Sequence, residues 1–240
     1  MKEELSQMKG EVVKEIRKVE NGRGKLTCSL LFLVFIFGLG GWFAWIYAAT
    51  GLFNVPVFSL FAYEDPVPVH IVTPGTPLET VVKENLQTIL VQRIQQGGGK
   101  LTDTSVTLTL NESSFTSTLQ SSLEASGVDY FDTDRVQIAI IENGTFEVFL
   151  PLKDRAKQTA VVADIELEIV NGGIVVKTGK VRLGSYVFPR LLTEFFADTI
   201  IKPQLPALNS SLGQYAKIES VSYTEGQITV NGNFDVKVVE

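Results

Sequence analysis

Two residue types that build many chemical sites are nearly missing from this chain of 240 residues, which has one cysteine, Cys28, and one histidine, His70. A single thiol forms no internal disulfide, and no residue after Cys28 offers a thiolate as nucleophile or zinc ligand. Gly-x-Ser-x-Gly, His-Glu-x-x-His and Walker lysine motifs are missing as well. We therefore expect no enzymatic activity, no cofactor and no metal site.

The tightest acidic cluster, Asp129, Asp132 and Asp134, does not change this expectation. A calcium loop would continue with a further ligand and a glycine at fixed spacing, whereas Arg135 follows here. We interpret the cluster as a solvated turn.

Lysine and arginine are missing from the 57 positions between Lys25 and Lys83. Residues 1–25 carry a net charge of +2 and the remainder of the chain carries −8. The acidic remainder argues against a nucleic-acid partner, because nucleic-acid binders neutralise phosphates with lysine and arginine. The positive-inside bias places the N-terminus in the cytoplasm and the C-terminal domain outside it, at the cell membrane.

The segment Leu26–Ala49 has 24 residues and no charged side chain. A helix of this length spans roughly 36 Å, enough to cross a hydrocarbon core of about 30 Å. A cleaved signal peptide would have a shorter apolar region, and a lipoprotein signal would end in a cysteine. A pilin leader would carry a glutamate early in the helix, and a soluble core helix would have a polar face. The sequence therefore predicts a single transmembrane signal-anchor.

Small residues recur every fourth position of this segment, at Gly40, Ala44 and Ala48. Such spacing lets two membrane helices approach closely, so a membrane-helix partner or a homo-oligomer is one interpretation. The other interpretation is the general abundance of glycine and alanine in membrane helices.

Four parts follow from these patterns. Residues 1–25 form an amphipathic cytoplasmic lead-in, and residues 26–49 form the transmembrane helix. Residues 50–75 form a proline-rich extended strap, in which alternating Val67, Val69 and Ile71 suit a sheet edge. Residues 76–240 form one extracytoplasmic domain.

The domain alternates helical and strand patterns. Thr76 fits a helix N-cap with Pro77 and Glu79 behind it, and Val82, Leu86, Ile89 and Leu90 share one face of this helix. Asn111 fits the N-cap of a second helix, and Gly179 marks a bulge in a later strand. Turn signals separate the expected elements: helices 76–95, 112–126 and 190–201, and strands 106–110, 136–142, 145–150, 165–169, 174–183, 218–223 and 227–238. Strands joined by tight turns pair antiparallel, and helices must cover the apolar face. We expect an α+β fold, a curved antiparallel sheet wrapped on helices.

Three stretches carry a resemblance to known proteins: VTLTLNESSFTSTLQSSL at 106–123, VRLGSYVFPRLLTEFF at 181–196 and IESVSYTEGQITVNG at 218–232. Together they resemble the YpmS-like membrane-anchored extracytoplasmic proteins of bacteria and, more distantly, the TULIP-like lipid-binding domains. The resemblance implies a twisted sheet wrapped around a helix, with an apolar groove for acyl chains.

Apolar residues on two of the expected helices are more numerous than one small sheet face needs. They are the candidate walls of a ligand groove: Phe115, Leu119, Leu123, Leu191, Leu192, Phe195, Phe196 and Ile200. The simpler interpretation of each residue is ordinary core packing. We expect a membrane-anchored module that binds lipid or another apolar ligand next to the membrane. The alternative is a structural or assembly subunit of a cell-envelope membrane complex.

Overall fold

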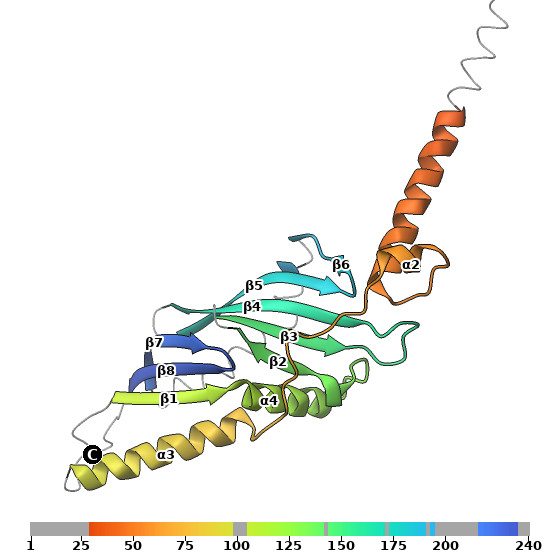
Figure 1. Cartoon of the computed structure of the whole chain (residues 1–240). Helices are drawn as coiled ribbons and strands as arrows, with labels where there is room; N and C mark the ends of the chain where they lie inside the picture. Colours follow the sequence, from red (N-terminus) through yellow and green to blue (C-terminus); the bar gives the residue numbers. More distant parts are fainter. Residues whose placement is uncertain are drawn as a thin grey trace, which may run out of the picture. The chain divides into compact units, whose positions relative to one another are not determined.

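The computed structural model describes residues 29–97, 105–141, 144–170, 173–190, 193–194 and 216–234 (Figure 1). The chain divides into two compact units, Met1–Tyr47 and Ala48–Glu240. One helix of the described ranges, Ser29–Thr50, is long and apolar enough to cross a membrane, with a mean hydropathy of 2.1. This helix matches the predicted span, while residues 26–28 and the predicted lead-in 1–25 lie outside the described residues.

A short helix, α2 (Phe58–Ala62), interrupts the strap that the sequence predicts as extended. Its first turn is closed by Ser59, whose hydroxyl accepts the N–H of Val55 at 2.9 Å. In return, the N–H of Ser59 donates to the carbonyl of Val55 at 2.9 Å. This turn differs from the predicted extended strap because Pro56, which favours extended backbone, also suits the start of a helix.

The strap is extended after α2, but it joins no sheet in the part of the chain that the structure describes. The alternating Val67, Val69 and Ile71 are 70%, 59% and 86% exposed. The N–H of Val69 donates to the side chain of Glu147 instead of a neighbouring strand. The alternation therefore marks an exposed stripe and not a paired sheet edge.

Three strands form an antiparallel sheet in the order β1-β8-β7. They are β1 (Ser105–Asn111), β7 (Ala216–Thr224) and β8 (Gln227–Phe234). Burial alternates along β1, as its pattern of aliphatic residues and threonines predicts. The predicted hairpin between β7 and β8 is confirmed, with Gly226 at φ +73° in its turn.

Five further strands form an antiparallel meander: β2 (Gln137–Ile140), β3 (Thr145–Pro151), β4 (Ala160–Val170), β5 (Gly173–Leu183) and β6 (Tyr186–Val187). The pairing of β4 with β5 shifts between Ala163 and Ile165, opposite Gly179. A Cβ on Gly179 would lie 3.3 Å from the Cβ of Asp164. This shift confirms the bulge predicted at Gly179. Glycine suits the position because the missing side chain lets strands β4 and β5 approach closely.

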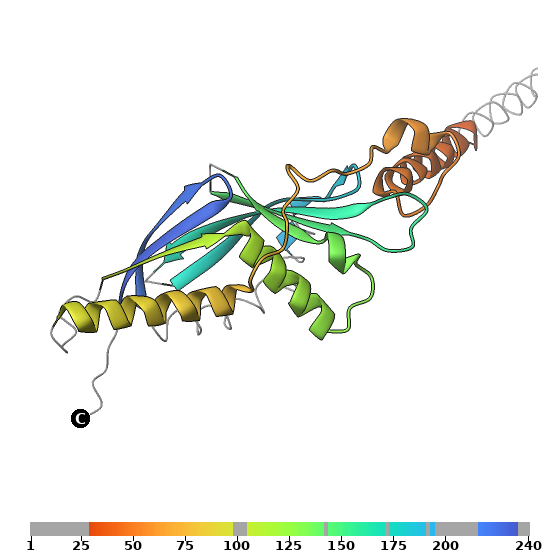
Figure 2. The ribbon, with the colours of Figure 1, turned by 60° about the horizontal axis from the view of Figure 1, so that its bottom comes forward.

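Helices α3 (Leu78–Gln96) and α4 (Glu112–Ala125) lie on one side of the sheets (Figure 2), and a short 3-10 helix, η1 (Thr133–Arg135), precedes β2. One core joins both helices to both sheets. Its buried side chains are Leu78, Val82, Leu86, Val106, Leu108, Leu110, Ile140, Phe146, Ile165, Ile218, Ile228 and Val230. The helical face predicted for α3 is confirmed, because Val82 and Leu86 are buried in this core.

The start of α3 differs from the prediction. The helix begins at Leu78, and the N–H of Leu78 donates to the hydroxyl of Thr118 on α4 at 2.7 Å. The first donor of the helix is thus satisfied by tertiary structure and not by Thr76. Asn111 does hold the N-cap position of α4 as predicted, without a side-chain capping bond.

The fold is α+β, as the sequence predicts, with the strands divided between two antiparallel sheets that do not close into a barrel. The three-stranded sheet is separate because β1 pairs with β8, which is far away in the sequence, and not with β2. Leu108 of β1, for example, lies opposite Val230 of β8. Of the predicted helix 190–201, residues 190, 193 and 194 are described and are helical, and the rest lies outside the described residues.

Candidate functional site

Polar side chains hold the strap on the folded domain. His70 Nε2 lies 2.9 Å from both carboxylate oxygens of Glu112 on α4. Gln137 on β2 donates from Nε2 to the carbonyl of His70 at 2.5 Å. Glu147 on β3, which is 5% exposed, accepts the N–H of Val69 at 2.7 Å. The histidine therefore has a structural partner, and the strap is fixed at several points along its length.

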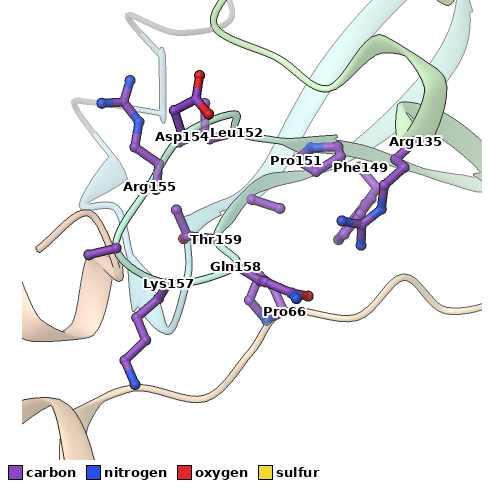
Figure 3. A pocket seen from close by; sticks show the side chains of 12 residues that line it. Pro66, Arg135, Phe149, Pro151, Leu152, Asp154, Arg155, Lys157, Gln158 and Thr159 are labelled. Carbon is purple, nitrogen blue, oxygen red and sulfur yellow. The ribbon is translucent and has the colours of Figure 1, made fainter. Parts of the chain in front are cut away.

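The strap forms one side of a cleft of about 250 Å³, which we call the loop cleft. It is lined by Pro66 of the strap, Arg135 of η1, Phe149 and Pro151 of β3, Ala160 of β4 and, from the β3–β4 loop, Leu152 and residues 154–159. Figure 3 shows Arg135 beside Phe149, with Lys157 on the far side of Gln158 and Pro66. The lining of the hollow thus combines apolar and cationic residues, and the side chains of Arg155 and Lys157 extend in different directions (Figure 3).

The charge of the loop cleft is positive in a domain whose overall charge is negative. Arg135, Arg155 and Lys157 contribute three cations, against one carboxylate from Asp154. Arg135 is weakly paired, since its Nη1 lies 4.0 Å from Asp132. Arg155 and Lys157 form no ion pair with any residue that the structure describes. These two cations are therefore available to an anionic ligand.

Hydrogen bonds join the loop cleft to the end of the apolar helix. Thr159 donates its hydroxyl to the carbonyl of Thr50, the last residue of that helix, at 2.7 Å. Tyr63, which follows α2, donates its phenol to the carbonyl of Gln158 at 2.6 Å. Burial is the main cause that raises the pKa of Tyr63 above its ordinary value of 10.0. Thr159, which lines the loop cleft, therefore contacts Thr50, where the apolar helix ends.

The structure gives different surroundings to the three small residues of the apolar helix. Gly40 is exposed, and Ala44 is partly exposed. Ala48 is fully buried in a cluster with Ala49 and Ala62. Ala48 is therefore covered by its own chain, and the packing of Gly40 and Ala44 against another helix stays a prediction.

Three of the predicted groove residues are described, and all three lie on α4. Phe115 packs against the core with its ring centroid 5.7 Å from that of Phe146, and Leu119 and Leu123 are partly buried. None of the three lines the loop cleft. Thr116 is among the most buried side chains of α4. Its hydroxyl accepts the N–H of Ile138 on β2 at 2.9 Å, which satisfies this polar group inside the domain.

The remaining predicted groove residues lie outside the described residues: Leu191, Leu192, Phe195, Phe196 and Ile200. A second hollow of about 340 Å³ lies between α3 and β1. Its lining is mainly polar, and Arg93 donates to Ser105 across it at 3.5 Å. This hollow does not resemble the predicted acyl-chain groove.

No sequence motif marks the residues of the loop cleft as a site. One local signal exists, because Lys153, Arg155 and Lys157 follow one another closely after Pro151. The approach of this loop to the strap has no local signal, since the bond from Tyr63 to Gln158 joins residues 95 positions apart.

The chain matches no protein-family model, no curated protein and no solved structure. The resemblance to YpmS-like and TULIP-like proteins therefore rests on the three sequence stretches alone.

Proposed function

We propose that this chain is a single-pass membrane-anchored protein whose domain, residues 76–240, lies on the extracytoplasmic side and binds an anionic lipid next to the membrane. The basic residues before the apolar helix support this orientation, because the side with more lysine and arginine stays in the cytoplasm. The resemblance to YpmS-like and TULIP-like proteins suggests the same class of ligand.

The loop cleft is the observation that carries the proposal. Arginine and lysine bind phosphate oxygens through charge-assisted hydrogen bonds, and Arg155 and Lys157 are free to do so among the described residues. Pro66 and Leu152, which are both partly exposed, offer apolar surface to the part of the ligand below the phosphate. An anionic amphiphile satisfies both requirements, and a membrane supplies such ligands close to Thr50.

Lipid extraction from the purified full-length chain tests this function. The protein is prepared in mild detergent, washed, and its bound lipids are quantified by mass spectrometry. Arg155→Ala with Lys157→Ala should remove about 2 kcal/mol of binding free energy, or roughly thirtyfold in affinity, at about 1 kcal/mol for each cation.

The matched control is Lys83→Ala with Lys180→Ala, which removes the same charge from two exposed positions away from the loop cleft. The control should retain the anionic lipid of the wild-type protein. Equal lipid loss in both variants would show that net charge, and not the cleft, controls binding. A wild-type protein that carries no lipid after washing would contradict the proposed function.

The second candidate is a structural or assembly subunit of a membrane complex. The exposed stripe of Val67, Val69 and Ile71 favours it, since apolar side chains gathered on a surface often mark a protein contact. Photo-crosslinkers at Val67 and Ile71 in native membranes test this function. A specific cross-linked species supports an assembly role, and a strictly monomeric protein removes it.

A further inference from the structure

Charge is missing from the chain well beyond the end of the predicted membrane span. Residues 26–63 contain 38 consecutive positions without a charged side chain or a histidine, and 14 of them, residues 50–63, follow the span. A segment that lies in water next to a folded domain usually carries charged residues. The composition of residues 50–63 is instead that of a segment in contact with lipid or protein.

The structure separates this segment into a covered side and an exposed side. Ser59 and Ala62 of α2 are 6% and 9% exposed, and Ala62 packs against Ala48 and Ala49 of the apolar helix end. On the exposed side, Leu60 and Phe61 are 78% and 76% exposed. Two large apolar side chains on one turn of helix are therefore left largely exposed by the residues that the structure describes.

A strained turn presents a third apolar side chain beside them. Val57 has φ 69° and ψ −54°, and the N–H of Phe58 donates to the carbonyl of Pro56 across it at 2.9 Å. This γ-turn is rare, and its positive φ is unfavourable for a β-branched residue. The Val57 side chain is 66% exposed, so packing inside the domain does not compensate for the strain. A contact outside the chain would explain why the turn is kept.

We infer that Val57, Leu60 and Phe61 enter the boundary between headgroups and acyl chains of the membrane leaflet next to the domain. Connectivity limits the choice of surroundings, because α2 begins eight residues after Thr50 and packs on the last turn of the apolar helix. An apolar helical face near a bilayer is buried about 5–10 Å into this boundary.

The neighbouring loop has the charge that such a position requires. Tyr63, at the end of α2, is bonded to Gln158 in the loop that carries Arg155 and Lys157. Cations beside an inserted apolar tip face the lipid phosphates. The inference rests on the proposed membrane span, and it adds a second attachment point that fixes how the domain meets the bilayer.

Depth-dependent fluorescence quenching tests this inference on the full-length chain. In a Cys28→Ser background, a nitrobenzoxadiazole label is attached at Leu60→Cys or Phe61→Cys. The protein is reconstituted into vesicles of phosphatidylcholine and phosphatidylglycerol that contain lipids with a spin label high or low on the acyl chain. Two further sites serve as references: Phe35→Cys within the apolar helix and Val91→Cys on α3, a site 54% exposed.

We expect the label at Leu60 or Phe61 to be quenched at least threefold more than the label at Val91, and most strongly by the shallow spin label. The label at Phe35 should respond most to the deep spin label. Quenching at Phe35 but not at Leu60 or Phe61 would overturn the inference and leave the membrane span intact. Missing quenching at Phe35 would overturn the membrane span itself. A blue-shifted label at Leu60 that no spin label quenches would indicate a protein contact and would also overturn the inference.

Discussion

Glu112 joins the strap to the sheet, because both of its carboxylate oxygens lie 2.9 Å from His70 Nε2 and one also accepts a backbone N–H of β2. That N–H belongs to Ile140, a fully buried residue whose N–H donates to Glu112 Oε2 at 3.0 Å. A single side chain thus satisfies a core donor and holds the strap against the domain.

Removing this carboxylate should destabilise the domain. Glu112→Ala leaves the N–H of Ile140 without its acceptor and His70 without its partner, which should lower the free energy of unfolding by about 1–3 kcal/mol. Chemical denaturation of the full-length chain in detergent measures the change. Glu84→Ala, at an exposed position of α3, is the control and should stay within about 0.5 kcal/mol of the wild type. An equal effect of the two substitutions would argue against the bridging role of Glu112.

Thr118 and Thr76 give opposite predictions for the start of α3. Thr118→Val removes the hydroxyl that accepts the N–H of Leu78 and should cost about 0.5–2 kcal/mol, as for the loss of a helix cap. Thr76→Val should leave the stability unchanged, because Thr76 is exposed and does not supply this cap. The same denaturation experiment compares them. A larger loss of stability in Thr76→Val than in Thr118→Val would show that Thr76 caps α3, as the sequence alone predicts.

Alanine substitutions at two glycines with positive φ distinguish the cost of backbone strain from the cost of a steric clash. Gly184 at φ +58° and Gly127 at φ +67° share the cost of an alanine in the left-handed region. A Cβ on Gly184 would also lie 2.7 Å from the carbonyl oxygen of Thr50, whereas one on Gly127 would meet no described atom within 4 Å. Gly184→Ala should therefore lower the unfolding midpoint more than Gly127→Ala and speed proteolysis around residue 50. Equal midpoints would show that the loop at Gly184 moves away without cost.

Alkaline pH should weaken the attachment of the strap through Tyr63. Burial raises the pKa of Tyr63 in the folded state, so the folded protein favours the neutral phenol that donates to Gln158. The contribution of the neutral Tyr63 to the free energy of unfolding is fully present below its unfolded-state pKa of about 10. This contribution is lost as the pH rises through the higher pKa that Tyr63 has in the folded state.

Unfolding midpoints measured across this range compare the wild type with Tyr63→Phe, which has no phenol to ionise. The midpoint of the variant should fall less steeply above about pH 10. Burial also raises the pKa of Tyr223, which is present in both proteins and so cancels in the comparison. Parallel curves would show that Tyr63 ionises equally well in the folded and unfolded states.

Elements with a local signal were predicted well from the sequence. The hairpin at Gly226, the bulge at Gly179 and the buried face of α3 each depend on residues close together in the chain. The pairing of β1 with β8 and the cap from Thr118 depend on tertiary contacts, and no short pattern records them. The helix α2 was not predicted, because a proline before it suits both an extended strap and the start of a helix.

The candidate site could be predicted only in part for the same reason. The apolar segment and the charge asymmetry predict a membrane anchor without any knowledge of the fold, and the structure has a helix there that is long and apolar enough to cross a membrane. The loop cleft required the strap and the β3–β4 loop to meet, which the sequence does not show. The sequence also does not reveal that Leu60 and Phe61 are largely exposed, since apolar residues next to a membrane span resemble the span itself.

The side of the membrane on which the domain lies is the premise of the proposed function, and cysteine labelling in intact cells tests it most directly. In a Cys28→Ser background, Tyr130→Cys places a thiol at a position of the domain that is 68% exposed, and Lys9→Cys places one before the apolar helix. A membrane-impermeant maleimide should label Tyr130→Cys in intact cells and Lys9→Cys only after the membrane is permeabilised. Labelling of Lys9→Cys in intact cells, with Tyr130→Cys protected until permeabilisation, would contradict the account.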